Sequence, residues 1–198
     1  GRSVIITSAL EETSARGGRA EVLTYRTAQD RKAIATDLLR GFRRIGVNGP
    51  GIVHSNYLEV QRLAPNAELV DVGEGLEASR LIKDREEVGR IRRACRIASR
   101  VADEIPGMLS RGMKEYEAAA ELDYRMMRMG ASGAAFGTNA SFGASSAEPH
   151  HAAEDIALKE GDTALFDFGC KVEGYCSDIT RTFFLGELED WQRRMYRV

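Results

Sequence analysis

The sequence predicts two units in series, an α/β unit over residues 1–80 and an α+β unit over residues 81–198. Three observations predict this order. Short β-branched runs alternate with helical segments in the first part, two long amphipathic helices follow, and two apolar strands joined by a short turn come after them. With 43% hydrophobic and 29% charged residues, the chain has the composition of a folded globular protein.

The first part alternates strand and helix patterns. We expect strands in SVIIT, AEVLTY, RIGVNG and AELVDVGE, and helices in DRKAIATDLLRGFRR and SNYLEVQRL. Gly and Asn-Gly mark the turns between them. This alternation favours an α/β layer.

Two amphipathic helices open the second part. The first begins at Asp84 and ends near Pro106-Gly107, and the second spans Lys114–Arg128 and ends at Gly130. Side chains three or four residues apart predict the buried face of each helix. For the first helix these are Val88, Ile91, Cys95, Ala98, Ala102 and Ile105. For the second they are Tyr116, Ala119, Ala120, Tyr124 and Met127.

A segment rich in Gly, Ser and Ala follows the second helix, ASGAAFGTNASFGASSAEPHHAAED. Phe136, Phe142 and the pair His150 and His151 are not residues of a flexible linker. We therefore expect strand and loop segments at a site. The residues alone leave open whether the two histidines form an exposed turn or belong to that site.

Charge and composition exclude several classes of partner. The net charge of −2, without a block of Lys and Arg, argues against binding to nucleic acid or to an anionic membrane. We interpret the arginine-rich segment GRIRRACRIASR as a solvated helix face. Three cysteines without CxxC spacing, and a start unlike a signal peptide, predict a cytoplasmic protein.

Two aspartates interrupt the apolar strands TALFDFG and GYCSDITRTFF. If the turn between the strands is Val172-Glu173, Asp167 lies directly opposite Asp178 and both side chains point to one face of the hairpin. Opposite Cβ atoms are about 4.5–5.5 Å apart, so the two carboxylates would repel each other.

A shared proton, an arginine or a divalent cation could offset this repulsion. Arg181 belongs to the other face of its strand, so a cation is the best physical explanation. The spacing leaves a second interpretation open, in which the register differs and each aspartate is satisfied separately.

The hairpin sequence GDTALFDFGCKVEGYCSDITRTF resembles, in order, the GD, D-x-G, GY and SD-I-T-R-T elements of the Xaa-Pro aminopeptidase and prolidase family. These are M24 metallopeptidases with the creatinase-like pita-bread fold. RLIKDREEVGRIRRA and GMKEYEAAAELDYRMMRMG resemble the first two helices of the family, and EPHH resembles the segment before its hairpin. The resemblance covers Leu81 to the end of the chain and, more weakly, the α/β part before it.

This resemblance implies that residues 81–198 form the first part of a pita-bread catalytic domain, and that residues 1–80 form part of a creatinase-type N-terminal domain. It implies that Asp167 and Asp178 bind two divalent metal ions, which we expect to be Mn, Co or Zn. It also implies that His150 is catalytic and contacts the substrate. The remaining ligands of the family, a His and two Glu, lie on later strands, so we expect this chain to be a partial one.

The function that the resemblance implies is hydrolysis of peptides with proline in second position, by a metal-activated water, in a homodimer. Two alternatives keep the same fold: a hydrolase of a non-peptide amide or amidine, and a binding protein without catalytic activity. Methionine aminopeptidases share the paired aspartates but lack the preceding α/β domain, so we consider them a weaker match.

Overall fold

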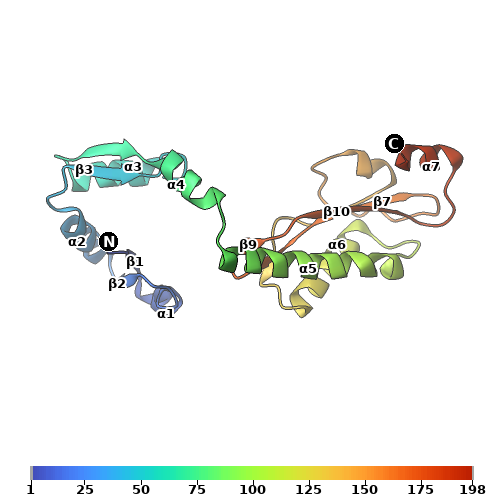
Figure 1. Ribbon diagram of the computed structural model, residues 1–198, viewed down its shortest axis with the longest axis horizontal. Helices are drawn as coiled ribbons and strands as arrows, with labels where there is room; N and C mark the ends of the chain where they lie inside the picture. Colours follow the sequence, from blue (N-terminus) through green and yellow to red (C-terminus); the bar gives the residue numbers. More distant parts are fainter. Residues whose placement is uncertain (1, 198) are drawn as a thin grey trace. The chain divides into compact units, whose positions relative to one another are not determined.

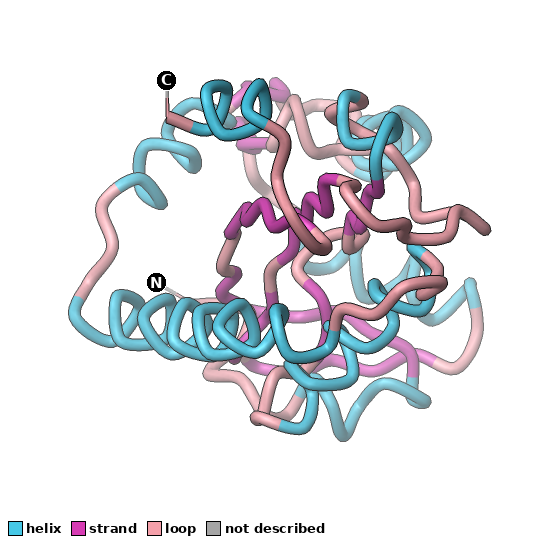
Figure 2. Tube along the Cα trace, turned by 90° about the vertical axis from the view of Figure 1, so that its right-hand side faces the viewer, coloured by secondary structure: helices cyan, strands magenta, loops and turns pink. Residues whose placement is uncertain are grey.

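The computed structural model describes residues 2–197. The chain divides between Ile82 and Lys83 into two compact units (Figure 1). Helices, strands and long connecting loops are distributed along the chain (Figure 2). Among the described residues, no helix combines the length and the apolar character that crossing a membrane requires.

The N-terminal unit contains two pairs of parallel strands. β1 (Val4–Ser8) pairs with β2 (Glu21–Tyr25), and β3 (Arg44–Val47) pairs with β4 (Glu68–Asp71). Parallel neighbours need a crossover connection, and helical segments supply it in both pairs. The helices of this unit are η1 (Ala9–Glu11), α1 (Glu12–Ala15), α2 (Ala28–Leu39), α3 (His54–Leu63) and α4 (Gly73–Leu81).

The predicted alternation of strands and helices in this unit is confirmed, but one helix ends earlier than predicted and η1, α1 and α4 are additional helices. α2 ends at Leu39, before the expected Arg44, because Gly41 adopts a φ of 83° that a helix cannot continue. The start of α4, Gly73 and Glu74, belongs to the segment AELVDVGE, for which the sequence predicts a strand. That strand, β4, stops at Asp71, whose carboxylate accepts hydrogen bonds from the backbone N–H groups of Gly49 and Gly73.

The first helix of the C-terminal unit is α5 (Arg85–Met108). Asp84 and Glu87 form a capping box at its start, where each side chain accepts a hydrogen bond from the other residue's backbone N–H. Two predicted inward positions, Val88 and Cys95, are exposed instead. The buried face comprises Ala94, Ala98, Val101, Ala102 and Ile105.

The second helix, α6 (Glu115–Arg128), has a buried face about one residue out of phase with the predicted one. Tyr116, Tyr124 and Met127 are about half exposed and Ala120 is exposed as well, so the predicted inward orientation of these four residues is wrong. The physical reason is close packing, since the small or flexible side chains of this helix, and not its rings, pack against the strands. The buried side chains of α6 are Glu115, Ala118, Leu122 and Met126.

Two three-stranded antiparallel sheets complete the unit. β7 (Thr163–Phe168) lies between β6 (Asn139–Phe142) and β10 (Ile179–Phe184). β8 (Cys170–Val172) lies between β5 (Gly133–Ala134) and β9 (Tyr175–Cys176). The remaining elements are η2 (Gly143–Ala147) and α7 (Asp190–Tyr196).

The core lies between these strands and the two helices. α5 packs on β8 and β9, and α6 packs on β5 and β6. Phe142, Phe166 and Phe168 are buried against the helices, and the rings of Phe142 and Phe166 meet edge to face with centroids 6.0 Å apart. This core gives the strand that carries Asp167 a rigid backing.

Candidate functional site

Asp167 lies near the end of the central strand β7 and is half buried. Its neighbours in sequence, Phe166 and Phe168, are fully buried, so the aspartate belongs to the opposite face of the sheet. Thr180 Oγ1 donates a hydrogen bond of 2.8 Å to Asp167 Oδ1 from the adjacent strand β10. Asn139 of β6 is the neighbour on the other side.

The turn of the hairpin differs from the predicted one by one residue. Val172 pairs with Tyr175, so the two-residue loop is Glu173-Gly174 and not Val172-Glu173. Glu173 has a φ of 49° and Gly174 a φ of 85°. Two residues with positive φ are what a tight hairpin between twisted strands needs, and glycine adopts this conformation without strain.

The prediction that Asp167 lies directly opposite Asp178 is therefore wrong. Moving the turn by one residue shifts the register by two, and Asp167 pairs with Thr180 instead. A two-residue shift leaves every side chain on its original face, so Asp178 and Asp167 remain on one face as diagonal neighbours. The burial supports this placement, because Ser177 is buried and Ile179 partly buried while Asp178 between them is exposed.

The backbone between the two aspartates is tightly packed. A Cβ atom on Gly169 would lie 1.9 Å from the carbonyl oxygen of Ser177, so only glycine fits there. The Ser177 hydroxyl also accepts a hydrogen bond of 3.1 Å from the backbone N–H of Cys170. This close approach of the two strands fixes the backbone positions of Asp167 and Asp178 relative to each other.

The chemistry of the aspartate pair fits divalent cations. Carboxylate oxygens are hard donors of the kind that such ions bind in proteins. No ion pair joins either aspartate to a Lys, Arg or His among residues 2–197, and Arg181 donates to the backbone carbonyl of Thr180. Within the same residues, no group of three or more His, Cys, Asp and Glu side chains is placed to hold a metal ion. The pair could therefore supply part of a metal site.

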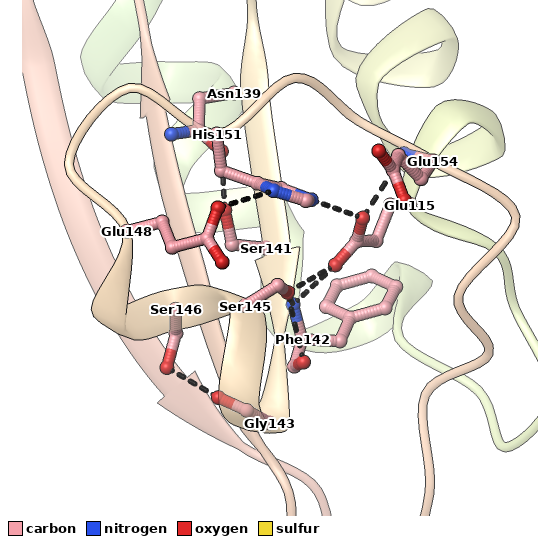
Figure 3. Close-up of polar contacts among 10 residues, drawn as sticks. All are labelled: Glu115, Asn139, Ser141, Phe142, Gly143, Ser145, Ser146, Glu148, His151 and Glu154. Atoms are coloured by element: carbon pink, nitrogen blue, oxygen red, sulfur yellow. Dashed lines mark hydrogen bonds and ion pairs between the residues drawn. The ribbon is translucent and has the colours of Figure 1, made fainter.

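The two histidines after η2 have different environments. His150 is exposed in a turn. His151 is partly buried, with Nε2 2.7 Å from Glu115 Oε2 and Nδ1 3.5 Å from Glu148 Oε2. Its imidazole lies between these two carboxylates (Figure 3).

Glu115 was not identified from the sequence, although its carboxylate organises this region. The residue is fully buried, and four groups donate to it or pair with it. Burial raises the pKa of Glu115, but the hydrogen bonds from Ser145, His151 and two backbone N–H groups outweigh it and leave the pKa below its ordinary value. The hydrogen bond to Glu115 raises the pKa of His151.

One signal in the sequence could have revealed Glu115. It precedes Ala118, Leu122 and Met126 at spacings of three, four and four residues, so it continues the apolar stripe of its helix. A lone carboxylate in such a stripe is expensive to bury unless partners surround it.

Comparisons with known proteins relate this chain to peptidases. The model of metallopeptidase family M24 matches residues 89–198. An uncharacterized peptidase of Bacillus subtilis, YqhT, is 34% identical over 158 residues, which are 80% of this chain and 45% of that protein. An Xaa-Pro dipeptidase of Pyrococcus horikoshii is 31% identical over 160 residues, which are 81% of this chain and 45% of that protein.

A solved structure shows the same likeness. The crystal structure of the prolidase from Pyrococcus horikoshii OT3 matches with a TM-score of 0.89 and 28% identity, over 98% of this chain and 55% of that one. The chain thus spans less than half the length of these two curated relatives and about half the length of this solved structure.

Proposed function

This chain belongs to metallopeptidase family M24, and from that membership we propose that the whole protein is a metal-dependent exopeptidase acting on peptides with proline in second position. The pita-bread fold predicted from the sequence is confirmed by the match to the prolidase structure. The proline specificity is supported by the relative named Xaa-Pro dipeptidase, at 31% identity.

The observation that supports the proposal is the alternation of burial along the hairpin, which assigns Asp167 and Asp178 to one face. In this proposal the two carboxylates hold two divalent ions, of Mn, Co or Zn, together with ligands outside the described residues. Such ions, when bound, activate a water and polarise the scissile carbonyl. Thr180 holds the Asp167 carboxylate in one orientation through its hydrogen bond, and the Gly169 contact keeps the two strands close.

His150 is proposed to contact the substrate. Its imidazole is exposed and can donate a hydrogen bond to the peptide carbonyl, or to the negative oxygen that develops during hydrolysis. The segment that carries it is anchored to the buried Glu115. A donor held in place before the substrate arrives stabilises developing charge better than a mobile one.

The proposal includes three further properties that were expected from the sequence and its resemblance to the family. Residues 1–80 form part of a creatinase-type N-terminal domain and residues 81–198 the first part of the catalytic domain. The protein is a homodimer. It acts in the cytoplasm on peptide substrates.

The test compares the purified whole protein on an Xaa-Pro peptide and on the matching Xaa-Ala peptide, with and without a chelator. We expect cleavage of the first peptide, little cleavage of the second, and loss of activity with the chelator that added Mn²⁺, Co²⁺ or Zn²⁺ restores. Equal cleavage of both peptides would refute the proline specificity. Activity that persists in the chelator would refute the metal mechanism.

A further inference from the structure

The buried carboxylate of Glu115 forms hydrogen bonds with residues before and after the exposed His150. On the N-terminal side, Glu115 Oε1 accepts hydrogen bonds from the Ser145 hydroxyl at 2.5 Å and from the Phe142 backbone N–H at 2.7 Å. Ser145 also accepts, at its carbonyl oxygen, the backbone N–H of Glu148. The chain entering the turn is therefore tied to the start of α6.

On the C-terminal side of His150, the other carboxylate oxygen of Glu115 contacts His151 and Glu154. Glu115 Oε2 lies 2.7 Å from His151 Nε2 and accepts a hydrogen bond of 3.0 Å from the backbone N–H of Glu154. The backbone N–H of Glu115 donates to the carbonyl of Ile156 at 3.1 Å. The chain leaving the turn is thus tied to the same residue.

The ion pair of Lys114 with Asp155 strengthens this second tie. Lys114 Nζ lies 3.0 Å from Asp155 Oδ1, and Lys114 forms a β-bridge with Ala157. Two consecutive residues at the start of α6 therefore hold the segment that follows His150. His150 itself is exposed between the two anchored ends.

A buried carboxylate is an expensive way to hold a loop unless its orientation matters. Glu115 has no exposed surface, and the His151 side chain is only 7% exposed. An apolar contact would hold the loop without the cost of removing a charge from water. Hydrogen bonds, unlike apolar contacts, fix direction as well as distance.

We infer that Glu115 and His151 are positioning residues, which set the conformation of the turn so that His150 faces the substrate. This inference rests on the proposed function of His150. Figure 3 shows the imidazole of His151 directed toward Glu115. The adjacent His150 is exposed. The other carboxylate that faces His151 is Glu148, which is exposed and lies farther away, at 3.5 Å.

The test uses the whole protein with Glu115→Gln, His150→Ala and the double variant. Glu148→Gln is the matched control, since it removes the same charge from the exposed carboxylate beside the same imidazole. We expect Glu115→Gln to lower kcat by about 10²-fold, as misplacement of a catalytic group does, with KM and bound metal unchanged. Glu148→Gln should leave kcat within about twofold of the wild-type value, because an exposed pair contributes little.

The double variant separates positioning from a general structural role. If Glu115 acts through His150, adding Glu115→Gln to His150→Ala lowers kcat no further. Losses that multiply in the double variant would overturn the inference. If Glu115→Gln does not fold, kcat is compared in the same way for His151→Gln, His150→Ala and the double variant of these two.

Amide hydrogen exchange gives a readout that does not depend on activity. We expect Glu115→Gln to increase exchange in residues 145–156 and to leave the strands β7 and β10 protected. Unchanged exchange in that segment, or increased exchange throughout the C-terminal unit, would overturn the positioning role. If the wild-type protein does not cleave Xaa-Pro peptides, the proposed function fails, and the exchange experiment still decides whether Glu115 holds the turn.

Discussion

Asp167 and Thr180 lie directly opposite each other on β7 and β10, and the threonine hydroxyl donates a 2.8 Å hydrogen bond to the aspartate. This pairing places a neutral donor where the sequence suggested a second carboxylate. It orients Asp167 without neutralising it. The second carboxylate, Asp178, directly precedes β10, and the alternation of buried Ser177, exposed Asp178 and partly buried Ile179 assigns it to the same face as Asp167.

Thr180→Val tests the orienting role of this hydrogen bond. Valine has nearly the shape of threonine but cannot donate, so we expect metal affinity to fall by about 10-fold or more, as loss of a ligand's hydrogen-bond partner does. Titration calorimetry with Mn²⁺ on the whole protein measures it. Thr182→Val, two residues along the same strand, is the control and should bind normally. Unchanged affinity in Thr180→Val would show that Thr180 does not orient a ligand.

Asp178→Asn tests the proposed metal role of the second aspartate. We expect metal binding and peptidase activity to be lost, while the metal-free protein changes its unfolding free energy by no more than about 0.5 kcal/mol, since the side chain is exposed. Denaturant unfolding in the presence of a chelator measures the unfolding free energy of the metal-free protein. Glu187→Gln, an exposed residue outside the hairpin, controls for the change of charge. A loss of several kcal/mol in the metal-free Asp178→Asn protein would indicate a structural role instead.

Gly169→Ala tests the close approach of the two strands. The added Cβ would meet the Ser177 carbonyl oxygen at 1.9 Å, and a backbone atom cannot move aside without distorting the strand. We expect a loss of about 1–3 kcal/mol in the unfolding free energy, as overpacking causes, together with weaker metal binding. Gly137→Ala is the matched control, because a Cβ there meets nothing within 4 Å. Equal stability of the two variants would contradict the close approach.

The pair of Glu115 and His151 predicts a dependence of stability on pH. The pKa of Glu115 is lowered in the folded protein, so its contribution is present above its ordinary pKa of 4.5 and is lost as pH falls through the folded value. The pKa of His151 is raised, so its contribution is present below its ordinary pKa of 6.5 and is lost as pH rises through the folded value. Both contributions are therefore complete between these two values.

The measurement compares wild type with His151→Gln by denaturant unfolding at pH 5.5 and at pH 8.5. We expect the wild type to exceed the variant by more at pH 5.5 than at pH 8.5. Glu148 faces the same imidazole, so the Glu148→Gln variant is measured as a control. Its stability should depend on pH nearly as the wild-type stability does, because an exposed pair contributes little. A difference in stability that grows toward pH 8.5 would contradict a charged His151 in the folded protein.

The side-chain pattern of the hairpin was enough to predict which face carries the aspartates, but not their register. Asp167 and Asp178 differ by an odd number of residues around a two-residue turn, and neither of the two turns changes the face of either residue. The choice between the turns depends on which residues adopt positive φ. Gly174 adopts positive φ without strain at one of the two loop positions. The pairing of Val172 with Tyr175 then places Glu173 at the other loop position.

The helices also combine a feature that the sequence predicts with one that only the tertiary structure decides. Period and length predicted α5 and α6, because amphipathic repeats are local features of a sequence. Which side of α6 is buried depended on the strands that pack against it, and these strands accept Ala118, Leu122 and Met126 and leave the rings of Tyr116 and Tyr124 outside.

The sequence by itself predicted the alternation of strands and helices in the first part, the two long helices of the second part and a shared face for the two aspartates, because each depends on the pattern of residues close together in the chain. Only the tertiary structure decided that Glu115 is buried and that His151 turns toward it while His150 stays exposed. The partners of that carboxylate lie 27 to 39 residues later in the chain. A charge can be buried only where such partners converge, and no local pattern records which distant groups the fold brings together.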